Sequence, residues 1–145
     1  MREFVVPIRP RYGEVDSMGV VYHAHYLVYF DIARTEYMRD RGAPYTGIED
    51  LGLRLAVVDA QVQYIRPARY DQEIVVAVWV SAITGASVSF EYQLRDAAGT
   101  TLATGLTRLA CLGPSNRPTR LPTELIQALG APAGRIGRIA PSETS

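Results

Sequence analysis

The chain has 145 residues, of which 48% are hydrophobic and 21% charged, the composition of a globular protein large enough for one substantial core. Its 15 basic and 15 acidic residues cancel, so no net charge attracts nucleic acid or an anionic membrane. No charged and then apolar leader opens the chain, and its single cysteine, Cys111, can form no internal disulfide. We therefore expect a single-domain cytoplasmic protein that binds no nucleic acid.

Residues 3–12 predict an opening strand that contains Pro7 and Pro10. Proline cannot donate a hydrogen bond to a neighbouring strand, and it is therefore confined largely to sheet edges. We expect this strand at the edge of its sheet.

Residues 24–38 predict a helix that is unusually apolar. Apolar side chains cover more than half of its circumference and leave a narrow polar strip around Arg34. Charged residues interrupt the run short of the ~20 residues that a membrane span needs, and Gly42 and Pro44 supply a stop. Other parts of the protein must cover this helix, and Arg34 and Glu36 are expected to form an ion pair on its surface or at an interface.

Beyond the helix, the hydrophobic period changes from about 3.6 residues to about 2, which is typical of strands. Four β-rich runs separated by turn signals predict antiparallel strands at residues 53–66, 73–83, 86–95 and 100–112. A short amphipathic helix is expected at residues 123–129. From Gly130 onward, a mixture of Gly, Ala, Pro and Ser predicts a loosely ordered tail. We place one domain at residues 1–129 and the tail at residues 130–145.

This order of elements predicts an α+β fold in which a five-stranded antiparallel sheet wraps around one long central helix. Such a sheet buries one side of the helix and leaves its other side and a sheet edge uncovered. A second copy of the chain would cover both. We therefore expect a homodimer, or a tetramer built as a dimer of dimers, with active sites at the subunit interface.

A string of residues before and within the helix carries a family resemblance. Residues 11–26 read RYGEVDSMGVVYHAHY, with an Asp-x-x-Gly-x-Val-Tyr-His element, and ARTE follows at residues 33–36. Together with YIRPARYD at residues 64–71 and RPTRLP at residues 117–122, this string resembles the signature of 4-hydroxybenzoyl-CoA thioesterase-like proteins. It looks most like their Tol-Pal-associated acyl-CoA thioesterase branch. The resemblance spans roughly residues 4–129 and implies the hotdog fold and acyl-CoA hydrolysis, with coenzyme A as part of the substrate and no separate cofactor.

Asp16 lies shortly before the helix, where a carboxylate can take part in chemistry. Gly19 permits a tight or positive-φ path, so the carboxylate can fold back toward the unpaired backbone N–H groups at residues 23–25. Those donors would polarise a thioester carbonyl, and one such donor is worth ~3 kcal/mol in acyl transfer. Asp16 would then either attack the carbonyl to form a mixed anhydride or activate a water as general base. The sequence leaves both routes open. Simple helix capping suits Asp16 less, because it lies about seven residues before the helix.

The resemblance implies that Asp16 is the catalytic carboxylate and that His23 occupies the helix-start position whose backbone N–H binds the carbonyl oxygen. The His23 side chain is expected either to donate a hydrogen bond or position water, or to be a satisfied, partly buried histidine. His25 is expected to be structural or to line the pocket. Residues two apart on a helix point to different faces, and no Cys or carboxylate cluster completes a site, so we expect no metal.

Residues at the helix start are also expected to bind the acyl part of the substrate. Tyr22 and Tyr26 either line an acyl tunnel or belong to the core or a dimer interface. Ala24 supplies a backbone N–H at the helix start.

The coenzyme A phosphates need basic partners. In the hydroxybenzoyl-CoA enzyme that the chain resembles, the turn between the third and fourth strands is strongly basic and grips these phosphates. Here that turn, residues 84–87, reads TGAS and carries no charge. We therefore expect Arg66 and Arg69 to meet the phosphates, and we include Ser87 among the substrate-binding residues. The uncharged turn favours a general acyl-CoA thioesterase over one specific for an aromatic substrate.

Two other classes of function remain open. A hotdog dehydratase for 3-hydroxyacyl thioesters needs a paired His and acid around a differently spaced loop, so the spacing from Asp16 to His23 favours hydrolysis. A non-catalytic acyl-CoA-binding module gains nothing from a carboxylate that faces an acyl carbonyl. The chain has no Gly-x-Ser-x-Gly elbow, which disfavours a serine thioesterase of the α/β-hydrolase type.

Overall fold

The computed structural model describes residues 3–130. The tail expected at residues 130–145 lies, apart from Gly130, outside the described residues. Within these residues the protein has an α+β architecture with five strands and three α-helices. The strands are β1 (Phe4–Ile8), β2 (Arg54–Tyr64), β3 (Ile74–Ile83), β4 (Ser87–Asp96) and β5 (Thr101–Leu112), and the helices are α1 (His25–Asp40), α2 (Tyr45–Asp50) and α3 (Thr123–Leu129).

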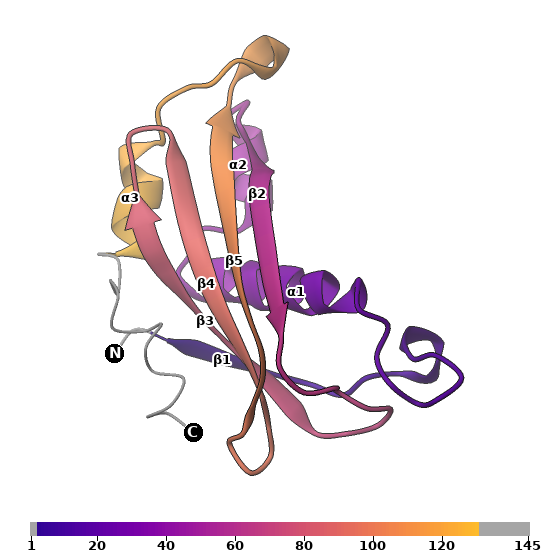
Figure 1. Ribbon diagram of the computed structural model, residues 1–145. Helices are drawn as coiled ribbons and strands as arrows, with labels where there is room; N and C mark the ends of the chain where they lie inside the picture. The colour runs from indigo at the N-terminus through magenta and orange to yellow at the C-terminus, as the bar shows by residue number, and fades with distance from the viewer. Residues whose placement is uncertain (1–2, 131–145) are drawn as a thin grey trace.

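The five strands form one antiparallel sheet in the order β1-β3-β4-β5-β2 (Figure 1). β1 lies at an edge, as its prolines predict, and pairs only with β3. β3, β4 and β5 follow one another as hairpins. β2 does not lie beside β3 but pairs with β5 at the opposite edge, so residues 65–73 cross from one side of the sheet to the other. A connection of this length can make such a crossing, whereas a tight turn would have made the two strands neighbours.

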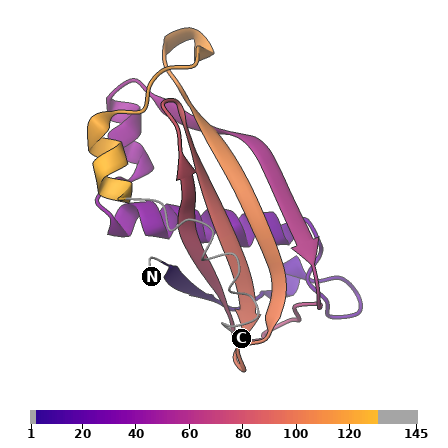
Figure 2. The same ribbon diagram turned by 60° about the vertical axis from the view of Figure 1, so that its left-hand side comes forward.

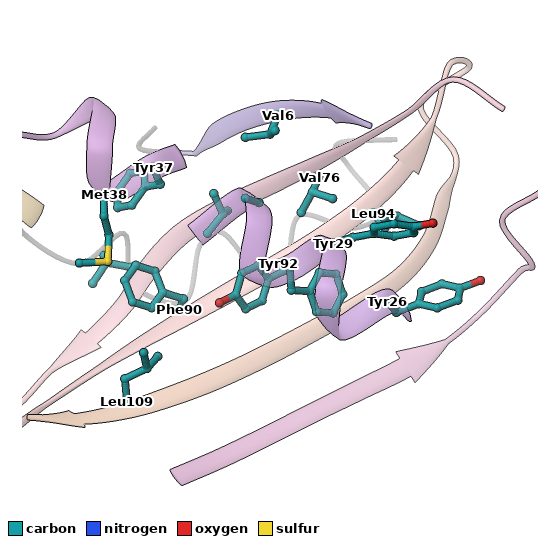
Figure 3. Close-up of a cluster of buried hydrophobic side chains, with 14 of the residues drawn as sticks. Val6, Tyr26, Tyr29, Tyr37, Met38, Val76, Phe90, Tyr92, Leu94 and Leu109 are labelled. Carbon is teal, nitrogen blue, oxygen red and sulfur yellow. The ribbon is translucent and has the colours of Figure 1, made fainter. Parts of the chain in front are cut away.

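The helix α1 lies across one face of the curved sheet (Figures 1 and 2) and is 16 residues long. Its buried side presents a row of apolar and aromatic side chains that packs onto the inward-facing residues of β3, β4 and β5 (Figure 3). The row consists of Tyr26, Tyr29, Phe30, Ala33, Tyr37 and Met38. On the other side, Val28 and Ile32 remain 44% and 40% exposed. The sheet therefore covers one side of α1 only, as the sequence predicts.

The ion pairs along the polar strip of α1 differ from the one that the sequence predicts. Arg34 pairs with Asp31 at 2.9 Å, and Glu36 pairs with Arg39 at 2.6 Å, so the predicted pair between Arg34 and Glu36 is wrong. Residues three apart share a helix face, whereas residues two apart do not. Arg34 is also buried, which the sequence did not indicate.

The helix α2 was not predicted. Its six residues are too few to show a helical period, and Gly42 and Pro44 were understood only as the end of α1. Pro44 precedes the first turn of α2, and Ile48 is buried in the core. Within residues 3–130, none of the helices has the length and apolar content needed to cross a membrane.

Candidate active site

Asp16 lies in a loop between a 3₁₀ turn (Tyr12–Glu14) and α1. Its Oδ1 atom accepts hydrogen bonds from the backbone N–H of Met18 at 2.8 Å and of Val20 at 3.2 Å. Gly19 has a φ of +76°, the positive-φ alternative of the two paths that the sequence allows. The recorded bonds of the carboxylate therefore stay within its own loop, and the expected bonds to the helix start are absent among the described residues. Asp16 is exposed to solvent.

A short backbone ladder fixes this loop against the residues that enter α1. The N–H of Asp16 donates to the carbonyl of Val20 at 2.9 Å, and the N–H of Tyr22 donates to the carbonyl of Glu14 at 3.0 Å. Val15 and Val21 form the antiparallel bridge between these two bonds. Asp16 is thus held at a fixed register relative to the first turn of the helix.

The helix start offers backbone donors without capping side chains. Ala24 is the N-cap residue and makes no side-chain cap. The N–H of His25 donates to the carbonyl of Tyr22 at 2.9 Å, so this predicted donor is already engaged. For the N–H groups of His23 and Ala24, no acceptor is recorded within residues 3–130. Two of the three predicted donors are therefore available at the positive end of the helix dipole.

Aromatic rings surround this helix start. Tyr22 and His23 are exposed neighbours, with ring centroids 4.5 Å apart. The hydroxyl of Tyr64, at the end of β2, donates to the carbonyl of His23 at 2.9 Å. A tyrosine hydroxyl is protonated at neutral pH, and partial burial with the nearby Tyr26 raises the pKa of Tyr64 further. Tyr64 was not singled out from the sequence, although it opens the family-like segment at residues 64–71.

Tyr26 fits the core alternative. It is only 3% exposed, and its hydroxyl accepts a hydrogen bond from the backbone N–H of Ala68 at 3.0 Å. His25 lies beside it on α1, and its Nδ1 atom is buried without a hydrogen-bond partner among the described residues. The Tyr26 hydroxyl therefore ties the crossing segment to α1.

The crossing segment brings one of the predicted arginines to the loop of Asp16. The backbone of Arg69 forms an antiparallel β-bridge with Val20, and the N–H of Tyr70 donates to the carbonyl of Gly19 at 2.9 Å. Arg66 lies earlier in the same segment, where its N–H donates to the carbonyl of Leu102 at 3.0 Å. Both arginine side chains are exposed.

Ser87 lies elsewhere. It begins β4, pairs with Ala110 and has its hydroxyl 2.7 Å from Thr84 Oγ1. The turn between β3 and β4 and the loop before α1 are at opposite ends of the molecule (Figure 1). The Arg120 guanidinium lies against Gly85 in this turn. The turn, uncharged in sequence, therefore has a basic neighbour that only the fold supplies.

A second acidic residue belongs to the loop and was missed from the sequence. Glu14 Oε1 accepts hydrogen bonds from the backbone N–H of Arg11 at 2.8 Å and from the hydroxyl of Tyr29 at 2.9 Å. The only sequence signal was its place two residues before Asp16. Within residues 3–130, no three His, Cys, Asp or Glu side chains are arranged to hold a metal ion.

The chain can be placed in a family on this geometry and on its sequence. The family described as the thioesterase-like superfamily matches residues 10–129. The chain belongs to the thioesterase-like superfamily. This membership confirms the predicted enzyme class, a thioester hydrolase.

Two curated bacterial proteins illustrate the sequence likeness. The chain is 37% identical over 92 residues to the putative acyl-CoA thioesterase YneP of Bacillus subtilis, covering 63% of this chain and 67% of that protein. It is 28% identical over 121 residues to the acyl-CoA thioester hydrolase YbgC of Escherichia coli, covering 83% of this chain and 90% of that protein.

Solved structures agree with the hotdog fold that the resemblance implied. The DHNA-CoA thioesterase from Staphylococcus aureus superposes with a TM-score of 0.84 at 27% identity, covering 100% of this chain and 97% of that one. A hypothetical protein, TT1821, from Thermus thermophilus superposes with a TM-score of 0.81 at 33% identity, covering 88% of this chain and 95% of that one. The predicted hotdog fold is confirmed.

Proposed function

We propose that the protein hydrolyses the thioester of an acyl-CoA to the free acid and coenzyme A, at the junction of the Asp16 loop and α1. The observation that carries this proposal is the exposed Asp16 carboxylate, held by a backbone ladder in the loop that leads into α1, whose start has two available N–H donors, those of His23 and Ala24. The curated names of YneP and YbgC, both given as acting on acyl-CoA, support this substrate class.

The helix start polarises the thioester carbonyl in this proposal. The carbonyl oxygen accepts hydrogen bonds from the N–H groups of His23 and Ala24, each worth ~3 kcal/mol where charge develops in the transition state. The dipole of α1 adds to this stabilisation because its positive end faces the same oxygen. Tyr64 keeps the donors in place through its bond to the His23 carbonyl.

Asp16 acts by one of two routes. As a nucleophile, its oxygen bonds to the carbonyl carbon while the C–S bond breaks and coenzyme A leaves as thiolate; one water then hydrolyses the anhydride to the free acid and the Asp16 carboxylate, and a proton released by that water goes to the thiolate. As a general base, Asp16 takes a proton from the attacking water and passes it to the departing thiolate. Both routes restore the carboxylate.

A dimer across β2 would complete the site. β2 is an 11-residue edge strand, and its Val57 and Val58 are 48% and 49% exposed, which makes it a template for pairing with a second copy. Antiparallel pairing of two β2 strands places the Tyr64 end of one protomer beside the Arg54 end of its partner.

This pairing accounts for the position of Ser87. Ala110 of β5 pairs with both Ser87 and Ala56, so Ser87 and the neighbouring Arg120 lie at the Arg54 end of β2. In the dimer, Ser87 and Arg120 of one protomer approach the Asp16 loop of the other. We propose this dimer, alone or doubled to a tetramer, with the active sites at its interface.

Within this proposal, the motif at residues 11–26 supports assignment to the Tol-Pal-associated branch, and the uncharged turn at residues 84–87 supports a general acyl-CoA substrate. The cytoplasm is the proposed location, because coenzyme A thioesters are made and used there.

The test is a panel of acyl-CoA substrates assayed with a thiol-detecting reagent, using wild type, Asp16→Asn and His23→Ala. Asp16→Asn should lower kcat by at least ~10² while acyl-CoA binding persists, because the helix-start donors remain. His23→Ala should lower kcat far less, since this variant keeps the backbone N–H of residue 23. A near wild-type rate in folded Asp16→Asn would refute the proposed function and favour an acyl-CoA-binding module.

A further inference from the structure

The Glu14 side chain, at the end of the 3₁₀ turn before the Asp16 loop, makes several polar contacts. Its Oε1 atom accepts the two hydrogen bonds from Arg11 and Tyr29, and its Oε2 atom lies 3.6 Å from the Arg11 Nε. Only 16% of its side chain is exposed, whereas Arg11 is 84% exposed. The carboxylate therefore points inward, toward α1.

Its partner Tyr29 belongs to the rigid part of the molecule. Tyr29 is 1% exposed and lies one turn after the start of α1, in the row that packs on the sheet (Figure 3). Burial and the neighbouring Glu14 raise the pKa of Tyr29, so its hydroxyl remains a donor throughout the neutral range. The bond ties the loop to the hydrophobic core.

Glu14 is ionised under the same conditions. Burial alone would raise the pKa of its carboxyl, but the hydrogen bonds from Arg11 and Tyr29 and the charges of Arg11 and His25 bring it below its ordinary value of 4.5. A charged acceptor makes the bond from Tyr29 stronger than one between neutral groups.

The backbone of the same residue forms one rung of the ladder that holds Asp16. The Glu14 carbonyl accepts a hydrogen bond from the N–H of Tyr22, which immediately precedes His23. Two residues after Glu14, the N–H of Asp16 donates to the carbonyl of Val20. The side chain of Glu14 thus fixes one end of the ladder to α1, and the ladder fixes Asp16 relative to the helix-start donors.

We propose that Glu14 is a positioning residue: through its bond to Tyr29, it sets the distance between the Asp16 carboxylate and the N–H groups of His23 and Ala24. This role rests on the proposed function of Asp16. Glu14 touches no reacting atom, and it acts on the geometry of the transition state. A misplacement of ~1 Å at a reacting group costs on the order of 10²-fold in rate.

The experiment compares steady-state kinetics of Glu14→Ala, Glu14→Gln, Tyr29→Phe and the double variant Glu14→Ala/Tyr29→Phe. Glu14→Ala and Tyr29→Phe should each lower kcat by about ten- to a hundredfold with KM nearly unchanged, because positioning matters in the transition state. The double variant should be no worse than Glu14→Ala, since both changes remove the same bond. Glu14→Gln keeps the acceptor oxygen and should recover most of the rate.

A matched control is Glu73→Ala, which removes an exposed glutamate paired with Arg9 at 3.0 Å and should retain wild-type kcat. Tyr29→Phe keeps the buried ring, so it remains folded and informative if Glu14→Ala does not. Wild-type kcat in Tyr29→Phe, or additive losses in the double variant, would overturn the positioning role.

Asp16→Asn separates this inference from the proposed function. If Asp16→Asn abolishes the rate while Glu14→Ala and Tyr29→Phe do not, only the positioning role fails. If Asp16→Asn keeps the rate, the proposed function itself fails. In the Asp16→Asn background, Glu14→Ala should cause no further loss, because there is no carboxylate left to position.

Discussion

The ring of Phe30 on α1 lies directly against the backbone of Gly105 in β5. A Cβ added at Gly105 would lie 2.9 Å from Phe30 Cδ2 and closer still to Cε2, nearer than real Cβ atoms approach. The same ring stacks on Tyr92, the cross-strand partner of Gly105, with centroids 4.6 Å apart and planes 12° apart. Gly105 therefore lets the central helix approach the sheet closely.

Gly105→Ala should lower the free energy of unfolding by about 1–3 kcal/mol, because the new methyl group must displace the Phe30 ring, which stacks on Tyr92. Denaturant unfolding monitored by circular dichroism measures this decrease in the free energy of unfolding. Gly47→Ala is the matched control, since its Cβ meets nothing within 4 Å and it should be neutral or stabilising. Adding Phe30→Leu to Gly105→Ala should restore part of the loss; equal stability of Gly105→Ala and Gly47→Ala would contradict the close contact.

The β2 edge predicts how the protein assembles. Val58→Arg should convert a dimer to monomers, because pairing across a two-fold axis near the middle of β2 would bring two arginines together. Multi-angle light scattering at micromolar concentration measures the change, and activity should fall with it. Val5→Arg is the control, since Val5 is 44% exposed on the opposite edge strand. A wild-type protein that is already a stable monomer would rule out the assembly.

Arg66 and Arg69 are predicted to meet the coenzyme A phosphates. Changing both to Ala should raise KM for acyl-CoA and leave kcat nearly unchanged, because phosphate contacts are equal in the ground and transition states. Arg120→Ala tests the arginine that the fold places at Gly85, and Arg39→Ala at the far end of α1 serves as a control. A KM that rises only in Arg120→Ala would assign the phosphates to the turn between β3 and β4.

The raised pKa of the buried Tyr92 predicts that the protein loses stability at alkaline pH. Burial raises its pKa from 10.0 to about 12, although the Arg34 charge and hydrogen bonds with Arg34 and Thr107 oppose the rise. The folded state therefore keeps a proton that the unfolded state loses. This contribution is fully present below pH 10.0 and is lost as the pH rises toward about 12.

Denaturant unfolding across that pH range should show the free energy of unfolding falling with pH, and Tyr92→Phe should reduce the slope. Tyr70→Phe, at a residue 51% exposed, should leave the slope as in wild type. The ultraviolet absorbance of tyrosinate provides a second measure, since some of the nine tyrosines should ionise only on unfolding. A stability that does not change across the range would contradict the prediction.

The sequence by itself determined the elements whose signals are local. Alternation of side chains predicted the strands, Pro7 and Pro10 predicted the edge position of β1, and the helix at residues 123–129 was predicted with the bounds it has. Gly19 was expected to allow a tight or positive-φ path before α1, and its φ is positive. Each of these depends on residues a few positions apart, which share a turn or a face.

Only the tertiary structure decided the relationships between residues distant in sequence. The place of β2 beside β5, the approach of Arg120 to Gly85 and the bond from Tyr29 to Glu14 join positions that no period or motif connects. The burial of Arg34 has the same origin, since the hydroxyls of Tyr45 and Tyr92 that accept its hydrogen bonds come from α2 and β4. A local sequence pattern determines on which face of a helix or strand a side chain lies. Which groups it contacts there depends on how α1 packs on the sheet.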